Sequence, residues 1–280
     1  MIRDITIGQY YQADSVVHRL DPRVKLMATL VYIISLFVAD SILGYAIATV
    51  FLIVSVKLSK VPVSYVLRGL KSLIFILVFS ASFIVLFSKG DNMLAKFWIF
   101  TISVEGIFNA IEMVFRLMLL LVGSSIMTFT TTPTDIADGL EKAFGPLKKI
   151  KVPVHEMSMM ISIAFRFIPI LIEETDKIMK AQIARGADFE TGGIIKKAKG
   201  LIPLLVPLII SSIKRALDLA TAMEARCYRG GEGRTKMKPL TYKEIDHNAY
   251  MILIFYVVII IGSNMLMNDV LGFSVMKFFV

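Results

Sequence analysis

Residues 249–267 read "AYMILIFYVVIIIGSNMLM", nineteen consecutive positions without a charged side chain. A helix needs roughly 20 apolar residues to cross a bilayer core of about 30 Å, so this segment predicts a transmembrane helix. The rest of the chain agrees, because 56% of its 280 residues are hydrophobic and its mean hydropathy is +0.72. An ordinary soluble domain is less apolar. The sequence therefore predicts a membrane protein.

Four further apolar stretches precede this one and predict four more transmembrane helices. Asp21 can cap the first, and Pro22 suits its first turn because no intrahelical N–H is needed there. Asp40 and Ser41 then predict a tight turn. The four helices are expected at 22 to about 39, at 42–56, around 73–87, and around 117–129 with an extension back to about 105.

The distribution of Lys and Arg predicts the orientation of these helices, since cytoplasmic loops carry more of both. Four lie before or in the first turn of the first helix (Arg3, Arg19, Arg23 and Lys25) and four separate the second helix from the third, whereas the turn at 40–41 has none. The next loop has only Lys89 and Lys96, and the C-terminal tail only Lys277. We therefore expect a cytoplasmic N-terminus and an outer C-terminus in the cell membrane, with Trp98 and Phe100 near the outer interface. No apolar segment precedes the first charges, so no cleavable signal peptide is expected.

Residues 131–248 carry nineteen of the thirty-one Lys and Arg residues and contribute most of the excess of positive charge in a chain whose net charge is +9. No recognition helix, zinc finger or basic sheet with interleaved aromatic residues accompanies this charge, which argues against a nucleic-acid partner. Membrane topology and attraction to anionic lipid explain it better. We expect this region on the cytoplasmic side of the bilayer.

Apolar residues recur at helical spacing through residues 131–248 and predict three amphipathic helices. In the first, Thr132 caps, Pro133 occupies the first turn, and Gly145 and Pro146 end the helix. The second is expected from about His155 to Arg185. The third contains "LIPLLVPLIISSI" at 201–213 and reaches Arg226.

The apolar halves of the second and third of these helices leave two topologies open. Arg166 would cost about 2.5–3.5 kcal/mol at the centre of a bilayer, and Pro169 disfavours a continuous span. Crossing twice would also place the four cations from Arg185 to Lys199 outside, against the pattern elsewhere. We therefore prefer two long helices packed on each other beneath the bilayer. A seven-span topology remains the alternative.

These patterns together predict an all-α polytopic membrane protein with about five transmembrane helices. Residues 1–130 would hold a leader and four of these helices. Residues 131–248 would form a cytoplasmic domain of three amphipathic helices, two of them long. Residues 249–280 would hold the fifth transmembrane helix.

The two long cytoplasmic helices end in the same pattern. "AQIARGADF" at 181–189 is matched by "AMEARCYRG" at 222–230, and both contain A-x-x-A-R. Gly186 can adopt the left-handed conformation that terminates a helix, which would display Arg185 at the tip. An arginine fork binds a carboxylate with two hydrogen bonds, so two such tips suit two equivalent grooves on a partner. The plainer alternative is that each arginine only balances the helix dipole, worth about 0.3–1 kcal/mol.

Taken with three other segments, these motifs resemble the CbiQ/EcfT family, the transmembrane coupling subunits of energy-coupling factor (ECF) transporters. The resemblance covers residues 8 to about 236. The other segments on which the resemblance rests are "GQYYQADSVVHRLDPRVK" at 8–25, "PTDIADGLEKAFGPLKKIKVP" at 133–153 and "FRFIPILIEETDKIMKAQIARG" at 165–186.

The resemblance implies a coupling role in an ABC importer. A family member joins a substrate-binding membrane protein, the S component, to two ATPase subunits of the EcfA and EcfA' kind. Its long cytoplasmic helices cross in an X, and their tips enter grooves on the ATPases. The residues carried over for ATPase docking are Ala184, Arg185 and Gly186 in the first motif and Ala225, Arg226 and Cys227 in the second.

Cys227 replaces the glycine that is usual in the family's second motif. Cysteine tolerates a positive φ less well than glycine, so the sequence leaves the end of the third helix uncertain. Gly230 and Gly231 offer a later stop.

No catalytic, cofactor-binding or metal-binding residues are predicted. "GGEGRT" at 230–235 lacks the P-loop lysine, so ATP would be bound by the partner subunits rather than by this chain. The three histidines, His18, His155 and His247, are scattered, and His18 suits a structural role in the leader. Glu112 and Arg116 favour an ordinary helix-surface pair. An acidic cluster at Glu173, Glu174 and Asp176 favours a solvated helix face.

The resemblance therefore implies a non-enzymatic coupling component for uptake of a vitamin or other micronutrient. One alternative is a dedicated subunit of a cobalt or nickel system. A self-contained permease is disfavoured by the few ionisable groups in the predicted spans. A lipid-modifying transferase would need a cluster of acidic or histidine residues at the interface, and none is evident.

Overall fold

The computed structural model describes residues 10–39, 41–88, 93–97, 100–145, 153–187, 193–230 and 240–269. The chain forms two compact units. We call residues Gly8–Gly139 with Leu240–Val280 the bundle unit, and the segment Leu140–Pro239 the helix-pair unit. Each is described by itself below.

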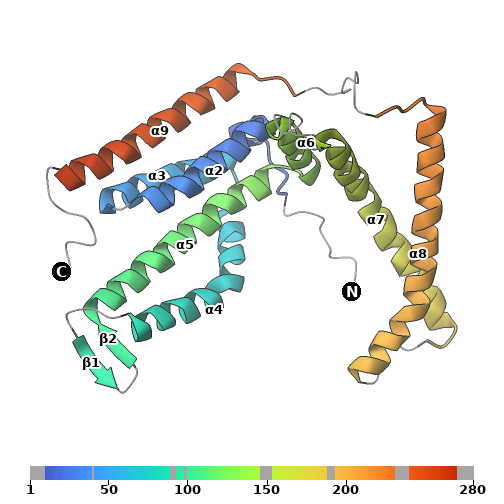
Figure 1. Cartoon of the computed structure of the whole chain (residues 1–280), viewed down its shortest axis with the longest axis horizontal. Helices are drawn as coiled ribbons and strands as arrows, with labels where there is room; N and C mark the ends of the chain where they lie inside the picture. Colours follow the sequence, from blue (N-terminus) through green and yellow to red (C-terminus); the bar gives the residue numbers. More distant parts are fainter. Residues whose placement is uncertain are drawn as a thin grey trace. The chain divides into compact units, whose positions relative to one another are not determined.

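The described residues are predominantly helical (Figure 1). The elements in chain order are α1 (Val16–Arg19), α2 (Pro22–Val38), α3 (Ile42–Ser59), α4 (Val63–Phe87), β1 (Met93–Phe97), β2 (Phe100–Ser103), α5 (Val104–Thr130), α6 (Pro133–Ala143), α7 (Val154–Ala184), α8 (Ile194–Ala225) and α9 (Glu244–Asp269).

The predicted all-α membrane class is confirmed. Five stretches of helix among the described residues are long and apolar enough to cross a bilayer: Ile42–Ser59, Val104–Thr130, Val154–Ala184, Gly200–Ala225 and Glu244–Leu266. α4 adds a sixth span if its two halves, which meet at a bend of 56° between Lys71 and Leu73, are taken together. α2, the first predicted transmembrane helix, has 17 residues, which is shorter than the roughly 20 that a span needs, and it is not among these five. Because α7 and α8 belong to this set, their cytoplasmic placement stays a prediction.

The helix starts follow the capping residues read from the sequence. The Asp21 carboxylate accepts a hydrogen bond from the Arg23 backbone N–H, and Pro22 opens α2. The Thr132 hydroxyl accepts from the Asp135 N–H at the start of α6, where Pro133 is the first helical residue. Both predicted starts are confirmed, and each cap satisfies a donor that has no partner within the helix.

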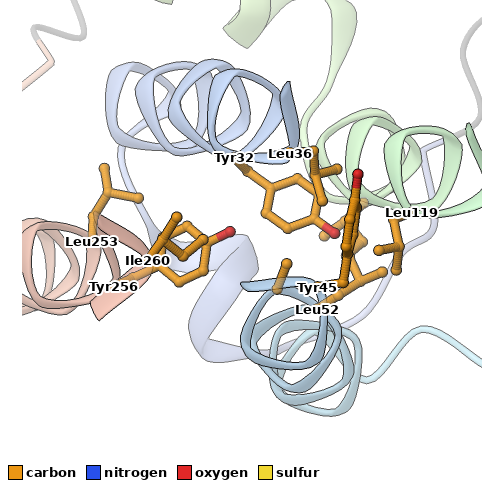
Figure 2. Packing of buried hydrophobic residues seen from close by; sticks show 10 residues of the cluster. Tyr32, Leu36, Tyr45, Leu52, Leu119, Leu253, Tyr256 and Ile260 are labelled. Carbon is orange, nitrogen blue, oxygen red and sulfur yellow. The ribbon is translucent and has the colours of Figure 1, made fainter. Parts of the chain in front are cut away.

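The core of the bundle unit lies between α2, α3, α5 and α9 (Figure 2). Tyr32 and Leu36 of α2 meet Leu119 of α5 and Tyr256 of α9 in one buried cluster. Gly123 of α5 permits the closest approach, because a Cβ atom there would lie 2.4 Å from the Tyr32 ring. Small residues have this role where helices pack in lipid, since van der Waals contact replaces the hydrophobic effect as the source of association.

Polar contacts fasten one end of this bundle. The buried Asp246 carboxylate of α9 accepts from the backbone N–H groups of Asp21 and Lys243, at 2.8 Å each. The buried Lys25 ammonium donates to the carbonyl oxygens of His18 and Thr130. The leader, α2, α5 and α9 are thereby joined at the residues that begin or end them.

A β-hairpin between α4 and α5 was not predicted. β1 and β2 pair antiparallel, with Phe97 opposite Phe100. The prediction that Trp98 lies near an outer interface falls outside the described residues, as do the side chains of Lys96 and Phe100. Asp40, Lys89, Pro146, Gly231 and Lys277 are likewise outside them.

The helix-pair unit contains the two long predicted helices. α7 matches its predicted limits, and α8 begins at Ile194, earlier than the apolar stretch at 201–213 suggested. Pro169 lies inside α7, and Pro203 and Pro207 lie inside α8. The two helices contact and cross each other (Figure 1), which confirms that they pack together.

Candidate functional site

α7 ends in a defined left-handed cap. Ala184 is its last residue, Arg185 follows at φ −88°, and Gly186 has φ +87°. The Gly186 N–H donates to the Ile183 carbonyl at 2.9 Å, and the Ala187 N–H donates to the Gln182 carbonyl at 3.0 Å. This pair of bonds is the Schellman motif, which satisfies two carbonyl groups that the helix itself leaves unpaired.

α8 ends in the same way forty-one residues later. Arg226 has φ −93° and Cys227 has φ +57°. The Cys227 N–H donates to the Glu224 carbonyl at 2.8 Å, and the Tyr228 N–H donates to the Met223 carbonyl at 3.0 Å. The later stop considered at Gly230 and Gly231 was wrong, because α8 ends at Ala225. Two cap hydrogen bonds hold Cys227 in a conformation that cysteine alone disfavours.

The two tips present equivalent groups. Arg185 and Arg226 occupy the same position in their caps, each is exposed, and the alanine before each is exposed too. Neither guanidinium pairs with an acidic side chain among the described residues. Each arginine directly follows the last helical residue and is exposed, so its guanidinium is accessible to a carboxylate from outside the chain.

The tips lie at opposite ends of the helix pair. α7 and α8 run in opposite directions, since Gln182 contacts Pro203 while Glu174 contacts Arg215. Arg185 lies three residues beyond Gln182, and Arg226 lies twenty-three residues beyond Pro203 on the other side. At a rise of about 1.5 Å per residue, the tips are separated by on the order of 40 Å. One small groove cannot receive both.

One acidic residue of α7 was misassigned from the sequence. Glu174, expected on a solvated helix face, forms a salt bridge with Arg215 of α8 at 2.8 Å and accepts a hydrogen bond from the Ser211 hydroxyl. These residues are separated by thirty-seven and forty-one positions, and no local pattern reveals such a pairing.

The pair formed by Glu112 and Arg116 in α5 is more than a helix-surface contact. The two side chains lie 2.8 Å apart, as the i, i+4 spacing predicted. Tyr45 of α3 joins them, donating from its hydroxyl to Glu112 at 2.9 Å and accepting from Arg116 Nε at 2.7 Å. The prediction of a simple surface pair is corrected to a polar link between α3 and α5.

The histidines have separate local partners. His18 lies 2.7 Å from the Ser15 hydroxyl and 2.9 Å from the Tyr11 carbonyl, as expected of a structural residue in the leader. His155 lies 3.0 Å from the Glu141 carboxylate. The described residues include no group of three or more His, Cys, Asp or Glu side chains placed to hold a metal ion.

Comparison with known proteins gives one consistent result. A family model described as CbiQ, cobalt transport protein, matches residues 13–237, which include both helix tips. The chain is 49% identical over 264 residues to the energy-coupling factor transporter transmembrane protein EcfT of Clostridium kluyveri, covering 94% of this chain and 98% of the relative. Identity to the EcfT of Lactococcus lactis subsp. cremoris is 44% over 260 residues, covering 93% and 98%. For the Bacillus subtilis EcfT it is 43% over 254 residues, covering 91% and 96%.

Proposed function

Because this chain belongs to the CbiQ/EcfT family of energy-coupling factor transporter transmembrane proteins, we propose that it couples two ABC-type ATPase subunits to a substrate-binding S component. The chain is a multi-pass membrane component of a transporter. In the proposed complex its crossed helices carry the movement of the ATPases to the S component, which holds a vitamin or other micronutrient.

The observation that carries this proposal is the pair of equivalent arginine tips. Each tip is slim, because an alanine precedes the arginine and a left-handed cap follows it. A charge-assisted, bidentate bond to a carboxylate in a groove would fix both the position and the direction of the helix end. A cation that only balanced the helix dipole would not need the same five-residue pattern and the same cap twice.

The spacing of the tips supports two ATPase partners rather than one. A separation on the order of 40 Å exceeds the reach of a single groove and suits two similar subunits side by side. Movement of the two ATPases toward or away from each other would then act directly on the ends of α7 and α8. Hydrolysis of ATP belongs to those partners in this proposal.

The apolar surface of α7 and α8 supports a third, membrane-embedded partner. Large apolar side chains are exposed on both helices, among them Met157 and Met160 of α7 and Ile202, Leu205 and Ile209 of α8. Methionine is flexible, which suits a surface that accepts more than one S component. The N-terminus and the arginine tips would lie in the cytoplasm, in accordance with the Lys and Arg distribution.

A second candidate is a dedicated cobalt or nickel system, which the description of the matching family model favours. The two candidates differ in the number of S components. A shared subunit would copurify with several different S components, and a dedicated one with a single metal-specific set.

Affinity purification of the tagged chain from its native membrane tests the proposal. We expect two ATPase subunits and at least one small membrane protein to copurify, and we expect no solute uptake by the purified chain alone in liposomes. Purification of the chain without ATPases, together with uptake by the chain alone, would instead establish a self-contained permease.

A further inference from the structure

A polar contact joins α7 to α8. Glu174 accepts hydrogen bonds from the guanidinium of Arg215 at 2.8 Å and 3.2 Å and from the Ser211 hydroxyl. The Glu174 side chain is 21% exposed and that of Arg215 39% exposed. Both carboxylate oxygens are engaged by the neighbouring helix, so rotation of α7 about its axis would break several bonds at once.

A second contact lies eight residues farther along α7 and depends on a proline of α8. The Gln182 side-chain amide donates to the Pro203 carbonyl at 3.4 Å. In a regular helix that carbonyl would accept from the N–H four residues later, but residue 207 is proline and has no N–H. Pro207 therefore leaves the Pro203 carbonyl available to α7, which gives this proline a reason to lie inside a long helix.

The two contacts together constrain the helix pair more than either one alone. Eight residues of helix span about 12 Å, so the contacts prevent sliding as well as rotation. Leu204 of α8, which lies between the two contacts in the sequence, is buried.

We infer that Glu174, Arg215, Ser211, Gln182 and Pro207 form a crossing clamp that sets the separation of the Arg185 and Arg226 tips. Glu174 is a positioning residue, because it acts on docking through the placement of the two tips and lies away from both. The consequence for coupling rests on the function proposed above, whereas the geometric effect of the clamp does not.

The helix segments that connect the clamp to the two tips differ in length. Arg185 lies three residues beyond Gln182, whereas Arg226 lies eleven residues beyond Arg215. A small change at the crossing is therefore amplified mainly at Arg226. A loosened crossing would alter the spacing between the tips even if each cap stayed intact.

A distance measurement on the purified full chain in lipid nanodiscs tests this inference without any ATPase. Cys227 is exposed and is the single cysteine of the chain, so one spin label can be attached at the α8 tip directly. Ala187→Cys supplies the second label just beyond the α7 tip. The Ala187→Cys chain, labelled at both cysteines, is the reference protein for the variants below and should give one narrow distance distribution near 40 Å, as the helix rise predicts.

Charge reversal then separates a clamp from a general structural role. Glu174→Arg and Arg215→Glu should each broaden or shift the distribution by about 5 Å or more, the size of one helical turn. The double variant Glu174→Arg/Arg215→Glu should restore the parent distribution. Glu173→Arg, the same charge change at the exposed neighbouring position, should leave it unchanged.

Unchanged distributions in both single variants, or failure of the double variant to restore the distance, would overturn the inference. An equal effect of Glu173→Arg would also overturn it. If a reversed variant does not purify as a folded protein, Glu174→Gln and Gln182→Leu provide milder losses with the same expected broadening. A tip variant can lose ATPase binding while its distance distribution stays normal, and that result concerns docking alone. The inference about the clamp and the proposed docking function can therefore fail separately.

Discussion

Cys227 occupies the position after α8 that Gly186 occupies after α7. Both residues have a positive φ, +57° and +87°, and both donate to the carbonyl three residues earlier. The same Schellman cap therefore occurs twice, forty-one residues apart, with glycine at its left-handed position after α7 and cysteine after α8. The arginine before each is therefore displayed in the same way, which is the structural basis for treating the tips as a pair.

The first prediction concerns the strain at Cys227. Cys227→Gly should stabilise the α8 cap by about 1 kcal/mol, because glycine adopts the left-handed conformation without the Cβ clash. Hydrogen exchange at the Cys227 and Tyr228 amides, whose N–H groups close the cap, should slow about fivefold. Cys227→Val should have the opposite effect, since a β-branched residue is worse at positive φ. Equal exchange in all three proteins would contradict the assigned cap.

The second prediction concerns the contact between Gly123 and Tyr32. Gly123→Ala should destabilise the bundle by about 1–3 kcal/mol, because the new methyl group overlaps the tyrosine ring. Gly262→Ala is the matched control, since a Cβ there meets nothing within 4 Å. Thermal unfolding in detergent should show a lower midpoint for the first variant and an unchanged or higher one for the second. Equal midpoints would show that α2 and α5 do not approach as closely as described.

The third prediction concerns the polar link between α3 and α5. Glu112→Leu removes the partner of Arg116 and should destabilise the bundle by about 1–2 kcal/mol, because the guanidinium is left half-buried and without its counter-ion. Glu112→Leu/Arg116→Met should be more stable than the single variant, since it removes the stranded charge. Thermal unfolding of the two proteins in lipid nanodiscs checks this order. A double variant less stable than the single one would contradict it.

The fourth prediction concerns the acid stability of the leader junction. Burial raises the pKa of the Asp21 carboxyl, but hydrogen bonds and the positive charge from Arg23 outweigh that and leave its pKa below the ordinary value. A lowered pKa in the folded state means that the ionised carboxylate stabilises the fold above the unfolded pKa of about 3.9. That stabilisation is lost as pH falls below about 4.

Asp21→Asn isolates this contribution. The variant should be less stable than the parent at pH 6, and the difference should shrink as pH falls toward the folded-state pKa. Thermal unfolding between pH 6 and the lowest pH at which the parent stays folded provides the comparison. A constant difference across that range would mean that the Asp21 charge does not contribute.

The sequence predicted the helices well because their signals are local. Asp21 with Pro22 and Thr132 with Pro133 marked two helix starts, and the structure places each cap as expected. Long apolar runs marked the other helices of the bundle, which depend on composition and length rather than on a particular partner.

The hairpin of β1 and β2 could not be predicted in the same way. Trp98 and Ile99 separate its strands in the sequence, and neither is the Asn or Gly residue that signals a tight hairpin turn. A short apolar segment between two transmembrane helices does not distinguish a strand pair from a loop.

The candidate site shows the same division between local and distant signals. The two Ala-Arg tips were visible because each lies within five residues of sequence. The pairing of Glu174 with Arg215 joins two helices, and the left-handed Cys227 depends on cap bonds that outweigh its intrinsic preference. Pro207 lies within the predicted third cytoplasmic helix, but no local pattern indicated that it leaves the Pro203 carbonyl available to Gln182 of α7.

Retention of the ATPases by charge-reversed tips tests the central claim most directly. Five tagged proteins would be purified from the same membrane and the copurifying ATPase quantified: the parent chain, Arg185→Glu, Arg226→Glu, the double variant and Arg229→Glu. Loss of a buried charge contact costs about 2–5 kcal/mol, so each single tip variant should retain ATPase at least tenfold more weakly and the double variant none. The exposed Arg229 lies three residues past the α8 tip and its reversal should have no effect. Full retention of both ATPases by the double variant would contradict the proposed docking.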